Sequence, residues 1–523
     1  MTTARRYADA VLRRSRVAME PVDFVPDWRD RPRPAKHFPG AELVPLGAGD
    51  YPADASVAAG LAAPGGTGRF TLPLLGGLLL DSYGLLGRRL GVPANTDLPA
   101  LPSYPEATWS RGAASAGGLY PVSVYWAAGP SGPVLPGLYH YSPGRHGLER
   151  LLAGDVSAEV REAAGGAGTD HFLLLGVQFW QNSFRYNSFS YHVVTMDTGA
   201  LLQTWRMWAH ARGLRVDPVL WFDEPRLTRL LGVDPDREGL FAVVPLRWTG
   251  LPDDSDPGGD LGGPRVRRAD AGRSRTVLDF PLVRAVHAST VDAPVRPDRA
   301  ALAAAGPPPA PAGGERVPLP APATLDLDVR TALRRRRSSA GRFSGRRPTT
   351  RPELAAVLAA AAAGAALPTD ATGAGLPLAS LHVLVNRVEG VPPGSYRHDP
   401  ATGELRLVRP GRSRAAGTRP ATRADDDLER AGAVLVPAVR TGAVLDACGD
   451  RGYRLVTALV GASCQAVHTA AAALGLACGV TLGFDGVSYV EELGLADTGE
   501  VPLLLMMIGH AGAGPADFRY ELA

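Results

Sequence analysis

The sequence predicts an α+β fold made of two related domains, each a mixed sheet flanked by helices, within one chain of 523 residues. Three observations predict this organisation. The chain contains a long internal repeat. Each copy alternates short strand patterns with one long helix pattern. A stretch rich in proline, glycine, aspartate and arginine separates the copies. Two related domains in one chain suggest an intramolecular pseudo-dimer.

The repeat is recognised from ordered residue pairs at a constant offset. LPGLYHYSPGRHGL, from Leu135, matches VPPGSYRHDPATGEL, from Val391, and the same offset sets SAGGLYPVSVY over TGAGLPLASLH. Further on, YHVVTMDTGALLQTWRMWAHARGL, from Tyr191, matches YRLVTALVGASCQAVHTAAAALGL, from Tyr453. Chance similarity in a chain rich in alanine, glycine and leucine would not keep a constant offset over such a length.

We therefore expect domains at residues 1–250 and 326–523, joined by a linker over residues 251–325. The linker composition cannot bury a core and is typical of an extended connection. The apolar island TVLDFPLVRAVHAST within it can dock onto a domain.

Each copy has the same expected order of elements: a helix, a glycine turn, a strand, a PGxY turn, a strand, a long helix and a last strand. The alternation in PVSVYW predicts a strand directly after the glycine turn. In the second copy the long helix covers roughly residues 453–475. The last strand is EVPLLLMMIGH, a near-continuous apolar run that is typical of a buried strand.

Composition excludes several classes of protein. A hydrophobic content of 45% and a charged content of 20% describe a globular protein, and a net charge of +3 argues against nucleic acid as the main partner. The three cysteines have neither zinc nor disulfide spacing. The N-terminus lacks the apolar core of a signal peptide, and no uncharged apolar run reaches membrane length. We expect a cytoplasmic protein that binds no membrane.

LRRRRSSAGRF, from Leu333 to Phe343, predicts a phosphate site. Guanidinium groups bind phosphate oxygens in pairs, and serine hydroxyls supply further donors. The alternative is a solvated basic stretch beside the linker.

Two further stretches carry candidate chemistry. SAGGLYP predicts a backbone platform whose N–H groups face a planar or anionic ligand, or else a plain turn into a strand. FRYNSFSY carries Arg185 and Tyr186 just before the long helix. A tyrosine phenol can act as acid or base, whereas arginine can only orient groups or stabilise charge. The alternative is a structural aromatic at a strand end.

Other patterns are weak or missing. WFDEP and GFDG are equivalent loops in the two copies, and a lone Phe-Asp loop says little. The histidines are scattered without metal-ligand spacing, so we expect no metal. The sequence has no GxSxG elbow, no P-loop and no GxGxxG fingerprint.

Together, RRRRSSAGRF, SAGGLYPVSVYW, PGLYHY and the long Tyr–Gly–Gln helix resemble the nitroreductase superfamily. They are most similar to its SagB/ThcOx-type branch, the FMN-dependent azoline dehydrogenases of ribosomal peptide pathways. In that branch a motif like RxxPSAGGLYPxExY precedes a PGLYxYxPxxHxL stretch. The resemblance covers most of both copies. It implies an intertwined dimer with FMN at the interface between subunits.

The resemblance also implies one composite flavin site, because each copy keeps a different half of it. The second copy keeps the phosphate motif and has the degraded turn TGAGLPL, whereas the first copy keeps the turn and offers only the distant LRRSRVAM, from Leu12, as a phosphate motif. The residues implied at the phosphate end are Arg336, Arg337, Ser338, Ser339 and Arg342. The residues implied over the flavin ring are Ala114, Ser115, Ala116, Gly117 and Gly118. The mirror-related site would be empty or vestigial.

The catalytic residues implied are Tyr186, as the base, and Arg185, which would favour the phenolate. The family carries Lys-Tyr in a KYGxRGYR motif. The first copy has RYNSFSYH, with Arg185 in place of the lysine, and the second has ACGDRGYR, which keeps neither reactive residue. Ala114 replaces the proline before the family serine.

The implied activity is oxidation of thiazolines or oxazolines in a peptide to thiazoles or oxazoles. A base would remove the Cα proton while a hydride leaves Cβ for the flavin, and dioxygen would reoxidise the flavin. The implied partners are an azoline-containing precursor peptide and a cyclodehydratase complex. Two alternatives remain: another flavin-dependent oxidoreductase of a natural-product pathway, and a non-catalytic scaffold that holds a peptide or partner protein.

Overall fold

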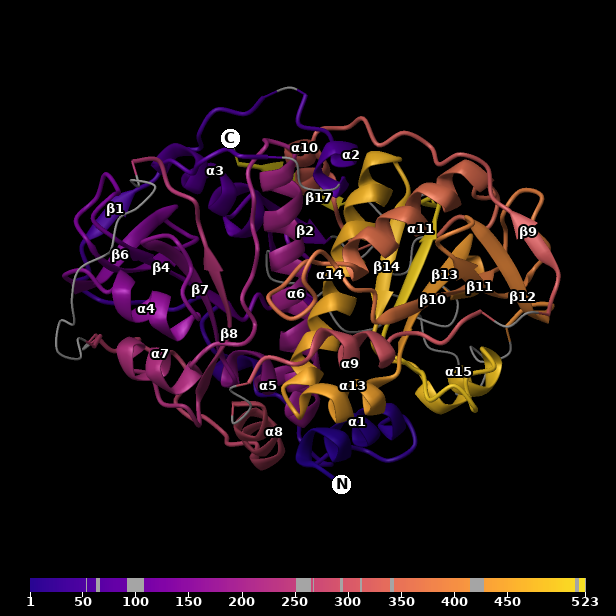
Figure 1. Cartoon of the computed structure of the whole chain (residues 1–523), viewed down its shortest axis with the longest axis horizontal. Helices are drawn as coiled ribbons and strands as arrows, with labels where there is room; N and C mark the ends of the chain where they lie inside the picture. Colours follow the sequence, from indigo (N-terminus) through magenta and orange to yellow (C-terminus); the bar gives the residue numbers. More distant parts are fainter. Residues whose placement is uncertain are drawn as a thin grey trace, which may run out of the picture.

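The computed structural model of the chain describes residues 1–52, 54–62, 66–91, 108–250, 265–266, 268–291, 295–310, 313–338, 343–413, 428–512 and 517–522. The chain folds into two large sheets with helices between and around them, as Figure 1 shows, and a small third sheet with the strand order β17-β2-β3. The first half lies on the left of that view and the second half on the right. The predicted α+β class is confirmed.

The elements of the first half are α1 (Thr3–Arg13), η1 (Trp28–Asp30), β1 (Leu43–Pro45), α2 (Val57–Leu61), α3 (Leu72–Tyr83), β2 (Gly87–Gly91), β3 (Thr108–Ser110), η2 (Ala116–Gly118), β4 (Val122–Ala128), β5 (Gly137–Ser142), β6 (Gly147–Ala153), α4 (Ser157–Ala163), β7 (His171–Gln178), α5 (Trp180–Tyr186), η3 (Asn187–Phe189), α6 (Ser190–His210), α7 (Glu224–Leu231) and β8 (Glu238–Pro245). The strand expected after the glycine turn is β4, and the long helix is α6.

The remaining elements are α8 (Pro281–Val291), α9 (Arg299–Ala304), β9 (Arg316–Pro318), α10 (Val329–Arg335), α11 (Arg351–Ala365), β10 (Ala379–Val385), β11 (Gly394–Asp399), β12 (Glu404–Pro410), β13 (Ala433–Val439), α13 (Thr441–Cys448), α14 (Gly452–Ala473), β14 (Ala477–Thr481), α15 (Gly486–Glu492), β15 (Val501–Pro502), β16 (Leu505–Gly509) and β17 (Asp517–Glu521). The second long helix is α14. The predicted last strand is divided into β15 and β16.

The second large sheet, followed from β9 to β16, repeats the strand order of the first, from β1 to β8, and adds β14 at its edge. The first runs β1-β6-β5-β4-β7-β8, and the second runs β14-β16-β13-β10-β11-β12-β9, with β15 on β13. All the strand pairs assigned in the described residues are antiparallel, so the expectation of mixed sheets is corrected. The reason is that short hairpins connect β4, β5 and β6, and likewise β10, β11 and β12. Parallel pairing is confined to isolated bridges such as that between Ser338 and Cys478.

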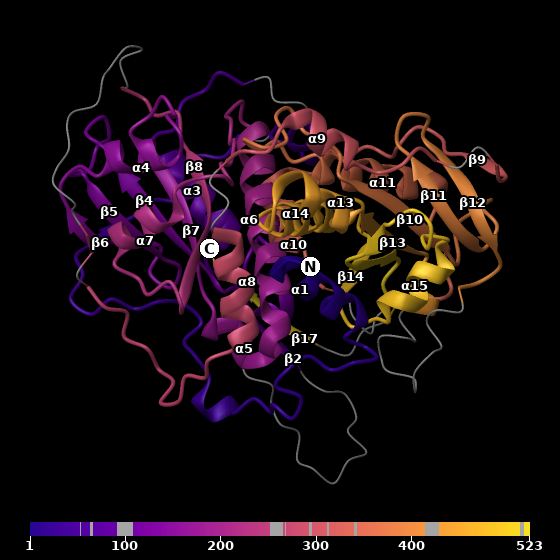
Figure 2. The same cartoon turned by 60° about the horizontal axis from the view of Figure 1, so that its bottom comes forward.

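Helices α6 and α14 lie side by side at the centre of the molecule, between the two sheets (Figures 1 and 2). Nearly all of their residues are buried, which explains their all-round apolar composition. Helix α14 is long and apolar enough to cross a membrane, but 94% of its apolar window is buried inside the fold, as in a core helix. The contact between the halves is therefore part of the main core.

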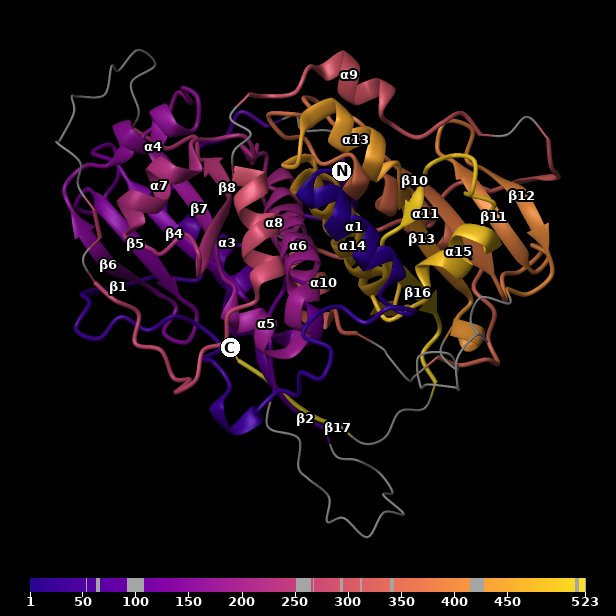
Figure 3. The same ribbon diagram turned by 90° about the horizontal axis from the view of Figure 1, so that it is seen from below.

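Segments near the ends of each half cross to the other half. The start of α2 pairs with the start of α10 through an antiparallel bridge between Ser56 and Asp328. Strand β17, from the C-terminal end, pairs with β2 of the first half, and Figure 3 shows it beside that strand. The two halves are thus intertwined rather than only in contact.

The segment expected to be a linker, residues 251–325, contains α8, α9 and β9, and α8 begins within the apolar island that was expected to be able to dock. Val283, Val286, His287 and Thr290 recur at helical spacing and are buried. Helix α8 contacts α1 beneath the central helices (Figure 3), and β9 pairs with β12. This segment therefore contains ordered elements that pack against both halves.

Candidate functional site

The glycine turn of the first half is held from below by α6. Gly117 and Gly118 have φ angles of 62° and 65°, which glycine adopts without strain. Asp197 of α6 accepts hydrogen bonds from Ser115 Oγ at 2.6 Å and from Ala116 N at 3.1 Å. Ser115 Oγ accepts a further bond from Tyr120 N at 2.9 Å. Gly117 and Gly118 themselves are exposed, so this backbone faces outward.

Two side chains of the second half reach the base of the same turn. Gln465 of α14 accepts a bond from Ala114 N at 2.7 Å and donates one to Gly112 O at 3.2 Å. Arg336, just after α10, donates to the carbonyl oxygens of residues 111, 112 and 113 at 2.8–3.1 Å. We call LRRRRSSAGRF, residues 333–343, the arginine–serine motif. The turn and the start of this motif are therefore adjacent in space, although more than 200 residues separate them in the sequence.

The two predicted catalytic residues lie against the turn. Arg185 Nη1 donates to Gly117 O at 3.1 Å, and a Cβ placed on Gly117 would lie 2.6 Å from the phenol oxygen of Tyr186. Both residues stand at the C-terminal end of α5, which Asn187 terminates with a φ of 43°. Arg185 is exposed and Tyr186 is half-buried. The geometry brings Arg185, Tyr186 and Gly117 together.

The expected effect of Arg185 on Tyr186 is outweighed. Burial raises the pKa of the Tyr186 phenol above 10.0, while Arg185 lowers it and Asp197 raises it further. The net effect is a raised pKa, because burial destabilises the phenolate by more than one exposed arginine stabilises it. At neutral pH Tyr186 is therefore a protonated phenol in this state of the protein.

The residues predicted at the phosphate end have different positions. Arg336 holds backbone carbonyls and so contributes to the architecture of the turn. Arg337 and Ser338 follow it and are exposed, and the backbone of Ser338 pairs with Cys478 of β14. Ser339 and Arg342 lie outside the described residues.

LRRSRVAM is not the counterpart of the arginine–serine motif, contrary to the sequence interpretation. Arg14 lies 4.4 Å from the ring centroid of Phe189 and 5.4 Å from that of Phe484, and Ser15 and Arg16 bind Asp485. In the sequence, LAAPGGTGRF, from Leu61, comes at the end of α2 as the arginine–serine motif comes at the end of α10, and residues 63–65 of it lie outside the described part of the chain. This stretch has none of the four consecutive arginines.

The equivalent turn of the second half lacks these partners. Leu459 stands on α14 where Asp197 stands on α6. Asp370 binds the amides of Leu220 and Trp221 and the guanidinium of Arg296, at 2.7–3.1 Å. The Gln203 amide nitrogen, equivalent to that of Gln465, is buried without a hydrogen-bond partner.

The segment around α9 approaches this second turn. Arg299, the first residue of α9, lies so close to Gly373 that a Cβ there would be 3.0 Å from its guanidinium carbon. Arg440, before α13, donates to the carbonyl oxygen of Ala304 at 3.2 Å. Figure 2 shows α9 beside α13. The connecting segment thus contacts the second turn at Gly373, while Gly373 and Ala374 stay exposed.

The two Phe-Asp loops have structural roles. Asp223 accepts a bond from Arg226 N at the start of α7, and Asp485 accepts one from Val487 N at the start of α15. Both are helix N-caps. Among the described residues, no group of three His, Cys, Asp or Glu side chains could hold a metal ion.

Sequence reasoning did not identify Asp197 or Gln465 as part of the site. Gln465 was visible only as one member of a repeated pair with Gln203. Asp197 had a signal, since its counterpart in the repeat is Leu459, and a charged residue on an otherwise apolar helix face needs a partner. Neither could be connected to the turn without the tertiary structure.

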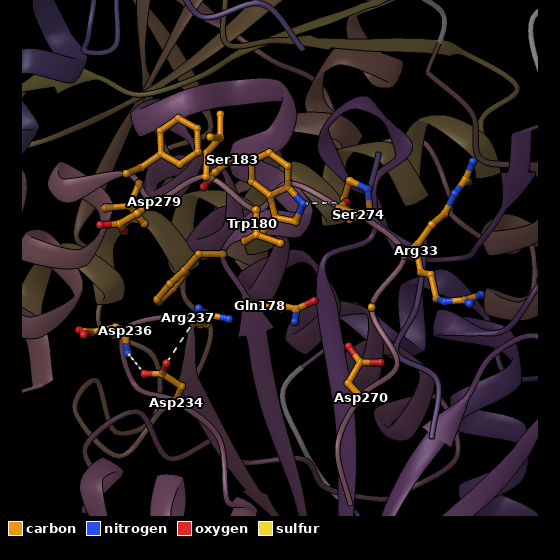
Figure 4. Close-up of a pocket in the computed structure, with 18 of the residues that line it drawn as sticks. Arg33, Gln178, Trp180, Ser183, Asp234, Asp236, Arg237, Asp270, Ser274 and Asp279 are labelled. Carbon is orange, nitrogen blue, oxygen red and sulfur yellow. Dashed lines mark hydrogen bonds and ion pairs between the residues drawn. The ribbon is translucent and has the colours of Figure 1, made fainter. Parts of the chain in front are cut away.

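A cavity of about 520 Å³ lies beside α5 (Figure 4). Trp180 and Ser183 of α5 line it, and Trp180 Nε1 donates to Ser274 Oγ at 2.9 Å. Four arginines and four aspartates also line it: Arg33, Arg237, Arg273, Arg284, Asp234, Asp236, Asp270 and Asp279. The helix that presents Arg185 and Tyr186 to the turn therefore also forms one wall of this cavity.

Comparisons with known proteins identify the fold. Residues 333–510 match the model of the Nitroreductase family. A candidate nitroreductase of Anabaena variabilis matches with a TM-score of 0.71 and 22% identity, over 98% of this chain and 99% of that chain. A search of curated proteins finds no match. The second half thus contains a nitroreductase family domain, and the whole chain has the fold of the Anabaena protein.

Two further solved structures match less of the chain. A candidate nitroreductase of Ralstonia eutropha has a TM-score of 0.31 and 22% identity, over 40% of this chain and 95% of that chain. The E. coli microcin synthetase McbBCD complex, with truncated pro-MccB17 bound, has a TM-score of 0.26 and 14% identity, over 44% of this chain and 74% of that chain. Scores this low support no conclusion about this chain.

Proposed function

We propose that this chain, whose residues 333–510 form a nitroreductase family domain, is an FMN-dependent oxidoreductase with one flavin site built jointly by its two halves. A single observation carries the proposal. Arg336, in the arginine–serine motif of the second half, binds the backbone just before the exposed glycine turn of the first half, and Gln465 of α14 binds Ala114 N of the same turn. Arg185 and Tyr186 converge on the same turn.

The residues present suit a flavin. No atom lies within 4 Å of the place where a Cβ of Gly118 would stand, so a planar ring can approach this backbone closely. Exposed Arg337 and Ser338 supply a charged and a neutral donor for a phosphate at the end of α10. We assign the phosphate end to these two residues, together with Ser339 and Arg342, and the ring end to Ala114, Ser115, Ala116, Gly117 and Gly118.

The finer proposal is oxidation of thiazoline or oxazoline rings in a peptide to thiazoles or oxazoles. The chemistry that FMN supplies when bound is acceptance of the hydride from ring Cβ, with dioxygen as the final two-electron acceptor. The chain itself must then take up the Cα proton. Tyr186 is the residue assigned to this step, and it must lose its own proton first, because its pKa is raised by burial. Arg185 would stabilise the resulting phenolate.

The cavity beside α5 is our candidate for the peptide that flanks the reacting ring. Its volume of about 520 Å³ is within the range of ligand pockets. Side chains of both charges line it, and exposed Val277 and Leu278 stand at its edge. An extended peptide with polar backbone and mixed side chains matches this lining. A cyclodehydratase partner remains implied by the sequence resemblance alone.

We also propose that the two halves are tandem copies that form an intramolecular pseudo-dimer, and that the second copy begins at α8 rather than at residue 326. Helix α8 contacts α1, the first helix of the first copy. The mirror-related flavin site then lacks a phosphate-binding motif, because the four consecutive arginines are missing from LAAPGGTGRF, and Arg299 lies against Gly373 of its turn.

The test is the visible absorbance of the purified protein, followed by release and identification of the chromophore. We expect one FMN per chain. Arg337→Ala should weaken FMN binding, whereas Arg335→Ala, which removes an equally exposed arginine from the neighbouring α10, should not. Two FMN per chain would show that the mirror-related site is also intact. A protein that stays colourless with added FMN would rule out the flavoenzyme and leave a binding scaffold.

One observation favours a second candidate function. Arg185 stands where the SagB/ThcOx-type branch, which this sequence resembles, has a lysine, and Tyr186 is a protonated phenol. A flavin oxidoreductase that does not abstract a proton would use the same FMN contacts. It would reduce or oxidise other substrates while leaving azoline peptides unchanged in the same assay.

A further inference from the structure

We propose that Asp197 is a positioning residue that holds the glycine turn over residues 115–118 in the conformation that receives the flavin ring. The inference rests on the proposed function. Three observations on the described residues carry it: the hydrogen bonds of this carboxylate, its place on a rigid helix, and the loss of the same group in the second half.

The carboxylate of Asp197 makes both of its bonds to the turn. Oδ2 accepts from Ser115 Oγ, and Oδ1 accepts from Ala116 N. Ser115 Oγ in turn accepts from Tyr120 N, so one side chain orients the start and, through Ser115, the end of the turn. The exposed Gly117 and Gly118 lie between these anchored points. A turn with two left-handed glycines has much conformational freedom, and these bonds restrict it.

The position of Asp197 is itself rigid. It lies in the middle of α6, next to α14, and is only 7% exposed. No ion pair in the described residues balances its charge, and burial raises its pKa to about 7. A buried carboxylate without a cationic partner destabilises a fold unless its hydrogen bonds compensate for the loss of hydration. The turn uses both of its oxygens.

The second half provides a natural comparison. Leu459 takes the place of Asp197, and the turn there has a different set of contacts. Thr372, the counterpart of Ser115, bonds within its own turn to Thr369 and to Leu367 O. Asp370 is directed to Leu220, Trp221 and Arg296. Where the carboxylate is missing, the hydroxyl equivalent to that of Ser115 bonds to residues 367 and 369, before the turn, and no longer to the central helix.

Two substitutions separate positioning from general stability. Asp197→Asn keeps an acceptor for Ala116 N and a polar group beside Ser115, whereas Asp197→Leu creates the side chain of the second half. We expect Asp197→Leu to raise the dissociation constant of FMN at least tenfold and Asp197→Asn to raise it less than threefold. Thr198→Val is the control, because Thr198 is equally buried on α6 but bonds only within the helix, to Val194 O.

The pH profile of FMN binding is a second measurement. Groups that face Asp197 are Tyr186 from α5, Tyr83 from α3 and Cys464 from α14. Burial raises the pKa of Tyr83 and of Cys464, to about 12 for Cys464, so neither titrates near neutral pH. The dissociation constant should therefore change between about pH 6 and pH 8 in the native protein and stay level in Asp197→Asn.

Amide hydrogen exchange of residues 115–120 in the flavin-free protein tests the positioning role independently of the proposed function. Asp197→Leu should speed this exchange, and Thr198→Val should not. If the native protein binds no FMN but Asp197→Leu still frees the turn, the positioning role stands and the proposed function fails. If Asp197→Leu leaves both the exchange and the FMN affinity unchanged, the inference is overturned.

Discussion

Gly199 of α6 and Gly461 of α14 occupy reciprocal positions where the two central helices meet. A Cβ on Gly199 would overlap the carbonyl oxygen of Ala458, and a Cβ on Gly461 would overlap that of Met196. Ala458 stands three residues before Gly461 on α14, and Met196 stands three residues before Gly199 on α6. The two backbones therefore touch at a point that only glycine permits, and both sides of the candidate site depend on this spacing.

Gly461→Ala should destabilise the protein and separate the halves slightly. An added methyl in a tight contact costs about 1–3 kcal/mol, which exceeds the gain of about 1 kcal/mol in helix propensity. Chemical denaturation should show the loss. Gly442→Ala in α13 is the control, because a Cβ there meets Arg5 at an ordinary 3.7 Å. Equal stability of both variants would contradict the close contact.

Gln465→Leu should weaken FMN binding about tenfold, because Ala114 N loses its partner at a cost of about 1–3 kcal/mol, while Gly112 O keeps only its bond from Arg336. Gln203→Leu is the matched control. It removes the equivalent side chain of α6, whose amide nitrogen is already without a partner. Titration of FMN into the two flavin-free variants would measure the difference. The prediction fails if both substitutions have the same effect on the affinity.

Tyr186→Phe should lower azoline turnover by about 10²–10⁴-fold while FMN stays bound, as expected on removal of a general base. Because the pKa of Tyr186 is raised by burial, the rate of the native protein should increase as pH rises above neutral. Single-turnover flavin reduction at several pH values would measure both effects. Tyr520→Phe, at an exposed tyrosine of β17, is the control. Unchanged turnover in Tyr186→Phe would exclude this residue as the base.

Glu224→Gln should destabilise the native state at neutral pH by about 3–5 kcal/mol, because it leaves the buried Arg454 without its carboxylate. Arg454 also binds Tyr191, Thr290 and His287, so this pair ties α8 to the central helices. Urea denaturation would measure the loss. Glu162→Gln removes an exposed partner of Arg226 and should cost less than about 1 kcal/mol.

The same pair predicts a pH dependence. Burial raises the pKa of Glu224, but Arg454, His287 and Arg451 outweigh it, so the net pKa lies below 4.5. A carboxyl with a depressed pKa stabilises the fold above its unfolded value and loses this contribution as pH falls through the folded value. The difference between the native protein and Glu224→Gln should therefore shrink below about pH 4.5. A difference that stayed constant into acid would contradict the depressed pKa.

The likeness of residues 333–510 to the Nitroreductase family, the α+β class and the main elements could be predicted from the sequence, since they depend on local patterns. The repeat predicted α6 and α14, and alternation predicted β4. The sheets were expected to be mixed, and this was wrong, because strand direction is decided by partners far away in the chain. The apolar island TVLDFPLVRAVHAST was expected to be able to dock onto a domain, and α8 begins within it.

By itself, the amino-acid sequence determined which residues are candidates for the chemistry: the glycine turn, the arginine–serine motif, and Arg185 with Tyr186. Their types and local order are sufficient for that prediction, because donors, acceptors and left-handed glycines are properties of single residues. Only the tertiary structure decided that Arg336 and Gln465 support the turn, that Asp197 lies beneath it, and that burial keeps Tyr186 protonated. Each of these depends on desolvation and on contact between segments far apart in the sequence, and no local pattern records that environment.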